Sequence, residues 1–268
     1  MLRVVLLTFF SMQLSRATPP VIVIDPGHGG SDHGAAYHIN EKTILEKDIT
    51  LELSQALSQV LEKMGYTVVL TRTTDQEMPL TERTVIANKL KAKLFISVHI
   101  NTSTNYRDGA QKPEGIETFI LNHSTPASSK RLADLENAVL KGSVAEQPKN
   151  EVGLIIKDLL LDSNRMESKK LACLIQMGLV KATSPTPQDK QKRNRGVKEG
   201  LFYILLGADM PSVLVEAGFF GHPKDQFWLR SPQGRASWIQ ALALAVDSYF
   251  KIQNTTKIRQ LLNSCQKH

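Results

Sequence analysis

Apolar residues in this chain occur in two patterns: short continuous runs, and stretches in which they recur every three or four positions. Val21–Ile24 is a run rich in β-branched residues that stops at a turn, which predicts a buried strand. Ile44–Met64 has the helical spacing and is followed by Gly65, a usual helix end. The same patterns predict strands at Tyr66–Leu70, Leu94–Val98, Gly115–Leu121, Leu201–Leu206 and Val213–Val215, and helices at Leu80–Ala92 and Ala236–Phe250.

Strands that alternate with helices predict an α/β fold. We expect a single domain over residues 21–252, with a mostly parallel twisted sheet flanked by helices. Residues 128–182 break the alternation and predict a helical insertion within that domain. Its expected helices are Leu132–Leu140, Glu151–Leu161 and Glu167–Val180, closed by a polar linker at Thr183–Arg195. The tail, residues 253–268, is polar and expected to be frayed.

The N-terminus has the pattern of a secretory signal peptide. Met1-Leu2-Arg3 gives a positive start, Val4–Leu14 is mostly apolar, and Ser15-Arg16-Ala17 offers small residues for cleavage. We therefore expect residues 1–17 to be a signal peptide and the mature protein to be periplasmic or secreted. An uncleaved anchor or a buried strand is the alternative. No later stretch is long and apolar enough to cross a membrane, so no span is expected after cleavage.

Charge and cysteine content narrow the partners only slightly. With 33 Lys and Arg against 26 Asp and Glu, the net charge of +7 favours an anionic partner such as a membrane surface or an acidic wall polymer. Nucleic acid is not expected, because no basic stripe is interleaved with aromatic residues. Cys173 and Cys265 are the two cysteines. They either form a disulfide or remain as a buried residue and a tail thiol.

Three residues with metal-binding side chains stand at comparable places in the predicted sheet. His28 follows the first strand within a glycine turn, and His99 follows the Leu94–Val98 strand. Because parallel strands end at the same edge, the two imidazoles can converge, and Glu46 in the first helical turn can join them. Two imidazoles and one carboxylate form a catalytic zinc set that leaves a fourth position for water.

Glu216 is a candidate acid/base beside that site. It follows the apolar strand Val213–Val215 and precedes Gly218, so we expect a partly desolvated carboxylate at the same sheet edge. Taken singly, each of these four residues also has an ordinary explanation, as a hydrogen-bonded loop histidine or a solvated carboxylate. Their joint occurrence at the ends of strands and a helix favours a metal-dependent hydrolase.

The chain resembles the zinc-dependent N-acetylmuramoyl-L-alanine amidases, the amidase-3 type of bacterial cell-wall hydrolases. The resemblance runs from Val21 to Phe250 and rests on several separate motifs. The motifs are Asp25-Pro26-Gly27-His28-Gly29-Gly30, Glu46-Lys47-Asp48, Thr71-Arg72, Ser97-Val98-His99-Ile100-Asn101, Asn194-Arg195-Gly196-Val197-Lys198 and Val215-Glu216-Ala217-Gly218-Phe219.

The resemblance implies roles for these residues. His28, Glu46 and His99 would bind Zn²⁺, and Glu216 would act as acid/base in cutting the amide between the lactyl group of N-acetylmuramic acid and L-alanine of peptidoglycan. Asn101, Arg195 and Lys198 are expected to contact substrate, although a solvated basic loop explains the last two equally well. Arg83 also matches a family position, and we interpret it as structural, paired with Asp75.

The insertion resembles the helical regulatory segment of the division-associated amidases. That segment covers the zinc cleft until an activator of the LytM type displaces it. A carboxylate at the fourth zinc position would block water, and Glu136 is the candidate here, with Glu151 as the second choice. The alternative is a structural excursion that helps to bind the glycan strand.

Three other functions are compatible with parts of the sequence. Ser248-Tyr249-Phe250-Lys251, Ser264-Cys265-Gln266-Lys267 and Ser103-Thr104-Asn105 match short motifs of penicillin-binding serine peptidases, but no K-T-G motif follows them. A D,D-carboxypeptidase on the same sheet would share the zinc ligands. A non-catalytic wall-binding protein is disfavoured, because all four candidate residues are present.

Overall fold

A computed structural model describes residues 18–39, 41–102, 112–122, 125–140, 151–252 and 255–265. For residues 128, 139–140 and 151–163 it describes the backbone alone. The expected signal peptide, residues 1–17, lies outside the described residues and stays a prediction.

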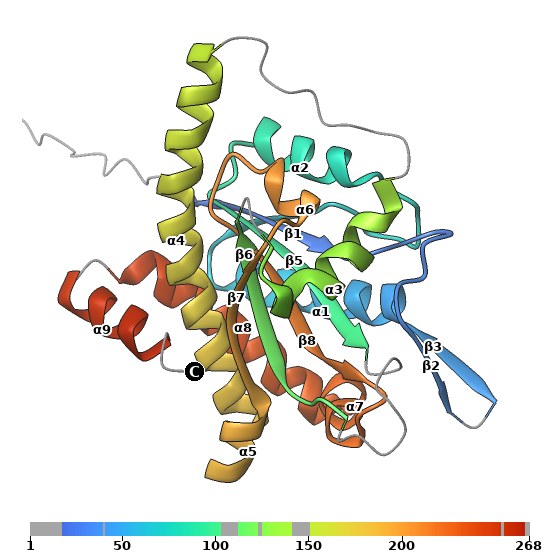
Figure 1. The fold of residues 1–268 in the computed structure, drawn as a ribbon. Helices are drawn as coiled ribbons and strands as arrows, with labels where there is room; N and C mark the ends of the chain where they lie inside the picture. Colours follow the sequence, from blue (N-terminus) through green and yellow to red (C-terminus); the bar gives the residue numbers. More distant parts are fainter. Residues whose placement is uncertain are drawn as a thin grey trace, which may run out of the picture.

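A six-stranded sheet forms the centre of the molecule (Figure 1). Neighbouring strands run parallel except β6 and β8, which are antiparallel. The predicted mostly parallel α/β sheet is therefore confirmed. The strand order is β4 (Thr67–Leu70), β1 (Val21–Pro26), β5 (Leu94–Thr102), β8 (Ser212–Phe220), β6 (Ile116–Leu121) and β7 (Asn194–Gly200).

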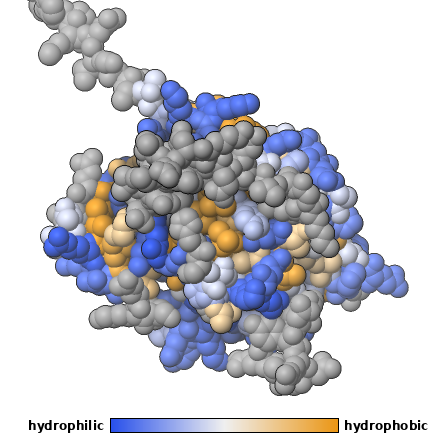
Figure 2. Space-filling view, turned by 45° about the horizontal axis from the view of Figure 1, so that its top comes forward, coloured by the Kyte–Doolittle hydropathy of each residue, from blue (hydrophilic) through white to orange (hydrophobic). Residues whose placement is uncertain are grey.

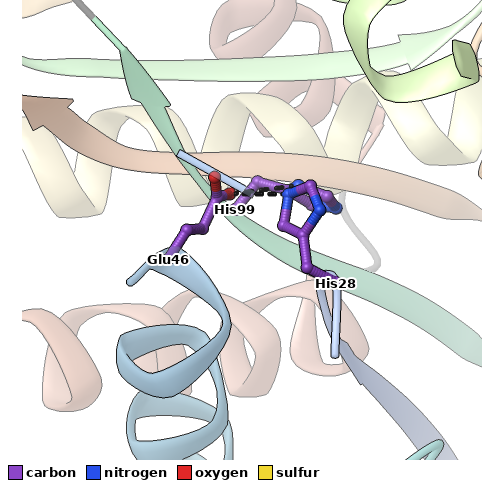
Figure 3. Close-up of side chains that lie close together, drawn as sticks. All are labelled: His28, Glu46 and His99. Atoms are coloured by element: carbon purple, nitrogen blue, oxygen red, sulfur yellow. Dashed lines mark ion pairs between the residues drawn. The ribbon is translucent and has the colours of Figure 1, made fainter. Parts of the chain in front are cut away.

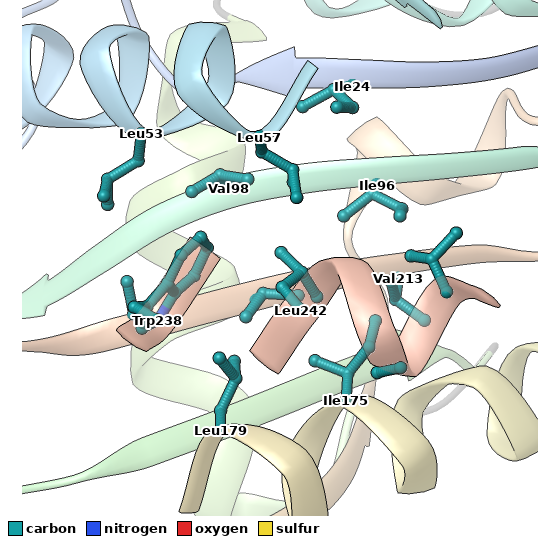
Figure 4. Close-up of a cluster of buried hydrophobic side chains, with 14 of the residues drawn as sticks. Ile24, Leu53, Leu57, Ile96, Val98, Ile175, Leu179, Val213, Trp238 and Leu242 are labelled. Atoms are coloured by element: carbon teal, nitrogen blue, oxygen red, sulfur yellow. The ribbon is translucent and has the colours of Figure 1, made fainter. Parts of the chain in front are cut away.

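Three long helices cover one face of the sheet: α1 (Glu46–Lys63), α4 (Glu151–Thr183) and α8 (Pro232–Lys251). Their buried side chains include Leu57, Ile175 and Trp238, which pack onto strand residues of this face in one hydrophobic cluster (Figure 4). The last part of the predicted insertion therefore belongs to the core of the sheet.

Shorter helices cover the other face. They are α2 (Leu80–Lys89), α3 (Ala127–Glu136) with the 3₁₀ turn η1 (Asn137–Leu140), and α6 (Tyr203–Leu206). A second hydrophobic cluster joins them to the sheet through Phe95, Phe119 and Leu214. Alternating side chains of β1, β5, β6 and β8 thus enter two different cores, as expected for strands buried on both faces.

The structure corrects the prediction for residues 183–206. The expected linker Thr183–Arg195 contains the helix α5 (Pro187–Arg193) and leads into strand β7, whereas the predicted strand Leu201–Leu206 contains the helical turn α6. β7 lies at the edge of the sheet and is paired only with β6. An edge strand needs no apolar run, so the polar sequence of β7 gave no indication of a strand.

Other differences concern helices and a hairpin. The two helices expected over residues 151–180 form the continuous helix α4, because neither Pro nor Gly interrupts residues 162–166. The expected frayed tail contains the helix α9 (Thr255–Cys265), which is joined to α4 by a Cys173–Cys265 disulfide. Elements without a prediction are the hairpin of β2 (Ala36–Ile39) and β3 (Lys42–Leu45), and the helix α7 (Pro223–Arg230).

On the face shown in Figure 2, apolar side chains gather near the centre and toward the left, among hydrophilic ones. Within the described residues, no helix combines the length and the apolar character that a bilayer span requires.

A buried ion pair anchors the end of β1. Arg83 Nη1 lies 2.9 Å from Asp25 Oδ1, and both side chains are almost fully buried. Thr71 and Ser97 also donate hydrogen bonds to this carboxylate. Burial alone would raise the pKa of Asp25, but Arg83 and the two hydroxyls hold it below its ordinary value. The predicted pairing of Arg83 with Asp75 was wrong, because Arg83 pairs with Asp25 and Asp75 pairs with Lys47.

Replacing Arg83 by Leu should destabilise the protein by about 3–5 kcal/mol, because it leaves a buried carboxylate without its counter-charge. The free energy of unfolding in urea at pH 7 measures this. Arg165→Leu is the matched control: it removes the half-exposed pair with Glu199 and should cost less than about 1 kcal/mol. An equal loss of unfolding free energy in the two variants would contradict the role of the Arg83–Asp25 ion pair in stability.

The difference in the free energy of unfolding between the native protein and the Arg83→Leu variant should become smaller in acid. In the native protein the pKa of Asp25 is lowered, so its contribution is present above the ordinary carboxyl pKa and is lost as the pH falls through the lowered value. In the variant burial raises the pKa of Asp25, so protonation removes the unpaired charge at a higher pH.

Candidate metal centre and catalytic site

The loop that carries His28 is held in an unusual conformation. His28 has a φ of 61°, a value that a residue with a side chain rarely adopts. Arg83 donates to the carbonyl oxygens of Pro26 and His28, and Arg72 donates to those of Pro26 and Gly27. These two buried guanidinium groups fix the loop, so the His28 ring is presented in one direction.

Gly27 allows the loop to pass close to the second histidine. A Cβ atom at this position would lie 2.6 Å from Cε1 of His99. Only glycine therefore allows the loop after β1 to pass so close to the His99 ring. The two imidazole rings meet edge to face, with their centroids 4.8 Å apart.

Glu46 is the first residue of α1, and two backbone amides fix its carboxylate. Ile100 N donates to Oε1 at 2.7 Å, and Ala35 N donates to Oε2 at 2.7 Å. Oε1 also lies 3.1 Å from Nε2 of His28 and 3.3 Å from Nδ1 of His99. Figure 3 shows the three side chains pointing toward one another from the β1 loop, α1 and β5. The structure therefore brings the predicted ligand set together.

The three residues fit a zinc ion. Their ligand atoms lie within 4.8 Å of one another, and Nε2 of His28 and Nδ1 of His99 are buried without a hydrogen-bond partner. Burial alone would lower the pKa of His99, but the carboxylates of Glu136 and Glu46 raise it to about 10. The cluster therefore attracts positive charge, and its two-histidine, one-carboxylate donor set is one that catalytic zinc uses.

Glu216 lies directly beside the cluster. Its register partner on β5 is His99, and the residue is completely buried, not partly as expected from the sequence. Neither carboxylate oxygen has a hydrogen-bond partner. Burial, with the nearby Glu46, Glu136 and Glu117 carboxylates, raises the pKa of Glu216 well above its ordinary value despite the opposing effect of His99. A carboxyl group in this state can hold a proton and deliver it.

Glu136 from the last turn of α3 reaches the same cluster. Its Oε2 lies 3.1 Å from Nδ1 of His99 and 3.6 Å from Nε2 of His28, the two nitrogens that have no hydrogen-bond partner. A cleft of about 620 Å³ is lined by His28, Glu46 and Glu136, among other residues. The second lid candidate, Glu151, begins α4, but its side chain lies outside the described part.

Asn101, Arg195 and Lys198 also converge, on a residue that the sequence analysis did not name. All three donate to the carboxylate of Glu117 on β6. The signal for it was a charged residue within the apolar strand Ile116–Leu121, where a buried position requires a partner.

Asp32 is the second residue that the sequence analysis missed. Its Oδ2 lies 2.9 Å from Nδ1 of His28, and its Oδ1 accepts a hydrogen bond from the Gly34 amide. This contact holds the ring so that Nε2 faces Glu46.

The remaining histidines and the serine motifs do not form a second site among the described residues. His33 and His38 are exposed, and the one metal-type cluster in the described ranges is His28, Glu46 and His99. Lys251 donates to Asp247, and Ser264 donates to the carbonyl oxygen of Leu261 in its own helix. His123, Ser103–Asn105 and Lys267 lie outside the described residues.

Comparisons with known proteins found similar proteins over most of the chain. A family model described as N-acetylmuramoyl-L-alanine amidase matches residues 22–248. The amidase AmiA of Escherichia coli K12 is 30% identical over 232 residues, which cover 86% of this chain and 76% of AmiA. AmiC of Neisseria meningitidis serogroup B is 29% identical over 244 residues, which cover 90% of this chain and about half (54%) of AmiC. The structure of an amidase from Clostridium difficile 630 has a TM-score of 0.63 at 24% identity and covers 89% of this chain and 100% of that one, which supports the fold.

Asp32→Asn should weaken zinc binding by about 10- to 100-fold, because the His28 ring loses the carboxylate that orients it. Competition with a chromogenic chelator measures the affinity. Asp48→Asn is the matched control: it removes an exposed carboxylate from the first turn of α1 and should leave the affinity unchanged. Identical zinc affinities for the two variants would refute this role of Asp32.

Proposed function

The chain belongs to the N-acetylmuramoyl-L-alanine amidase family, and we propose that it hydrolyses the amide bond between the lactyl group of N-acetylmuramic acid and L-alanine of the peptidoglycan stem peptide. The observation that carries this proposal is the His28, Glu46 and His99 cluster with the buried, unpartnered Glu216 at its side. Hydrolysis of an amide needs an activated carbonyl, a water nucleophile and a proton for the leaving nitrogen. The proposed residues serve these three needs.

His28, Glu46 and His99 would hold zinc, which acts as a Lewis acid toward the scissile carbonyl and toward water. Glu216 takes a proton from the attacking water and delivers it to the departing amine nitrogen. The hydroxyl thus goes to the lactyl carbonyl carbon and the proton to L-alanine. The backbone amides of Ile100 and Ala35 keep the Glu46 carboxylate in place throughout.

The insertion acts as a lid over this site in our proposal. Glu136 lies against the nitrogens of both histidines and occupies space that substrate and water need. Leu132 and Ala133 of α3 are buried in the second hydrophobic cluster. Asn137 donates to the carbonyl oxygen of Leu201 and accepts from the amide of Tyr203, which fastens the end of the lid. These contacts favour a lid over a glycan-binding excursion, and an activator of the LytM type would displace it.

The proposed site of action is the cell wall outside the cytoplasm. The signal-like residues 1–17 and the family's substrate support this location, and the net charge of +7 suits an acidic wall polymer.

Glu216→Gln should lower kcat on purified peptidoglycan by about 10²- to 10⁴-fold, because the amide of Gln cannot transfer the proton. Zinc content should stay unchanged. Mass spectrometry should detect stem peptides that begin at L-alanine with native protein, and none after chelation. Glu52→Gln, at an exposed position on α1, is the control that keeps full activity. Release of a terminal D-alanine instead would establish a carboxypeptidase and contradict the proposed bond.

Glu136→Ala should raise the basal rate by about tenfold or more, because it removes a charged group from both histidine nitrogens. Asp134→Ala on the same helix is the matched control. Its carboxylate is exposed and pairs with Lys130, so its loss should leave the rate unchanged. A basal rate that stays constant, or that rises equally in both variants, would exclude Glu136 as the inhibitory group.

A further inference from the structure

A row of polar residues crosses the sheet beside the metal centre. His99 on β5 is the register partner of Glu216 on β8, and Glu216 is in turn the partner of Glu117 on β6. Residues directly opposite on neighbouring strands point to the same face of a sheet. Glu117 therefore lies next to Glu216 on the face that α3 covers, one strand further from the metal ligands.

Glu117 collects three donors from two other strands. Its Oε1 accepts from Nε of Arg195 at 2.5 Å and from Nζ of Lys198 at 2.7 Å. Its Oε2 accepts from Nδ2 of Asn101 at 3.0 Å. Two cations thus share one carboxylate, and the cluster carries one net positive charge.

The exposure of these cations differs from that of a purely structural ion pair. The Glu117 side chain is 4% exposed, but those of Arg195 and Lys198 are 30% and 21% exposed. The pair of Arg193 and Asp225, two positions before Arg195, is buried on both sides, at 1% and 0%. Glu117 is therefore buried, while the two cations that pair with it remain partly exposed to solvent.

Both cations keep donors for a further ligand. A guanidinium group has five N–H donors and an ammonium group has three. Within the described residues, the side-chain hydrogen bonds of Arg195 and Lys198 come from Nε and Nζ respectively, and both go to Glu117. The Arg195 guanidinium also lies over the Phe219 ring, 5.0 Å from its centroid, which limits how it can turn.

We propose that Glu117 is a positioning residue that holds Arg195, Lys198 and Asn101 together as a carboxylate-binding site for the stem peptide. Because Glu117 fixes their positions, the two cations make the enzyme prefer stem peptides with free carboxylates over amidated ones. This inference rests on the proposed amidase function and adds a substrate preference to it.

The test uses two synthetic muramyl peptides of equal length, one with free stem carboxylates and one with each converted to a carboxamide. For native protein, kcat/KM should be at least about tenfold higher for the acid form, mainly through KM. Glu117→Gln should reduce this ratio to near one, because the cations lose their shared anchor. Arg195→Gln should reduce it similarly, and the double variant should lower it no further, since the two residues act through each other.

Glu199→Gln is the matched control. It makes the same chemical change on β7, where Glu199 pairs with Arg165, and it should keep the native ratio. If Glu117→Gln lowers kcat/KM equally for both peptides, Glu117 is a structural residue and the inference is overturned. A native ratio near one overturns it as well.

A second measurement separates this inference from the proposed function. Fluorescence anisotropy of the two labelled peptides reports binding to the zinc-loaded protein without any turnover. If no variant, including Glu136→Ala, hydrolyses either peptide, the amidase proposal fails. The binding ratio of the acid to the amide form then decides alone whether the carboxylate site exists.

Discussion

The geometry of the site depends on the backbone carbonyls that follow β1 and on the two arginines that hold them. Arg72 and Arg83 are buried, and together they donate to the carbonyl oxygens of Pro26, Gly27 and His28. Arg83 also neutralises Asp25 at the end of the same strand. Guanidinium is suited to this task because its five donors have fixed directions and it stays charged when buried. The positive φ of His28 persists because these surrounding contacts hold it.

Stability and function place opposite requirements on the polar side chains of the site, because folding favours satisfied buried atoms and the proposed chemistry needs unsatisfied ones. Nε2 of His28, Nδ1 of His99 and both oxygens of Glu216 are buried without a hydrogen-bond partner, which costs folding free energy. Carboxylates 3.1 Å from the two nitrogens offset part of that cost. Two hydrophobic clusters, one on each face of the sheet, offset that cost. Glu117 differs from these groups because three donors satisfy it. In the proposed function, the atoms without a hydrogen-bond partner lie where a metal ion and a proton would act, and the satisfied Glu117 carboxylate lies where substrate would be held.

The parts that the sequence predicted follow from local rules, and the parts that it missed depend on tertiary pairing. His28, His99 and Glu216 were identifiable because parallel strands end at one edge, so residues after apolar runs converge there. Motif resemblance added the roles of all four candidates. Strand β7 was missed because an edge strand is defined by its partner β6 and not by its own composition. The turn α6 was predicted as a strand because residues 201–206 form an apolar run. Glu117 was missed for a related reason: its donors come from β5 and β7, and no spacing along the chain links them.

The insertion consists of two parts with different physical roles, and this decides how its function can be tested. Leu171, Ile175 and Leu179 of α4 are completely buried against α8 and the sheet, so this part belongs to the core. The α3 part also contributes Leu132 and Ala133 to the second cluster, yet its last turn brings Glu136 to the histidines. Deleting the insertion from Leu132 onward would remove buried apolar surface together with the carboxylate that we propose to be inhibitory. Lost activity would then report unfolding as readily as regulation. Substituting Glu136 alone leaves both clusters intact, so a change in rate can be assigned to the carboxylate.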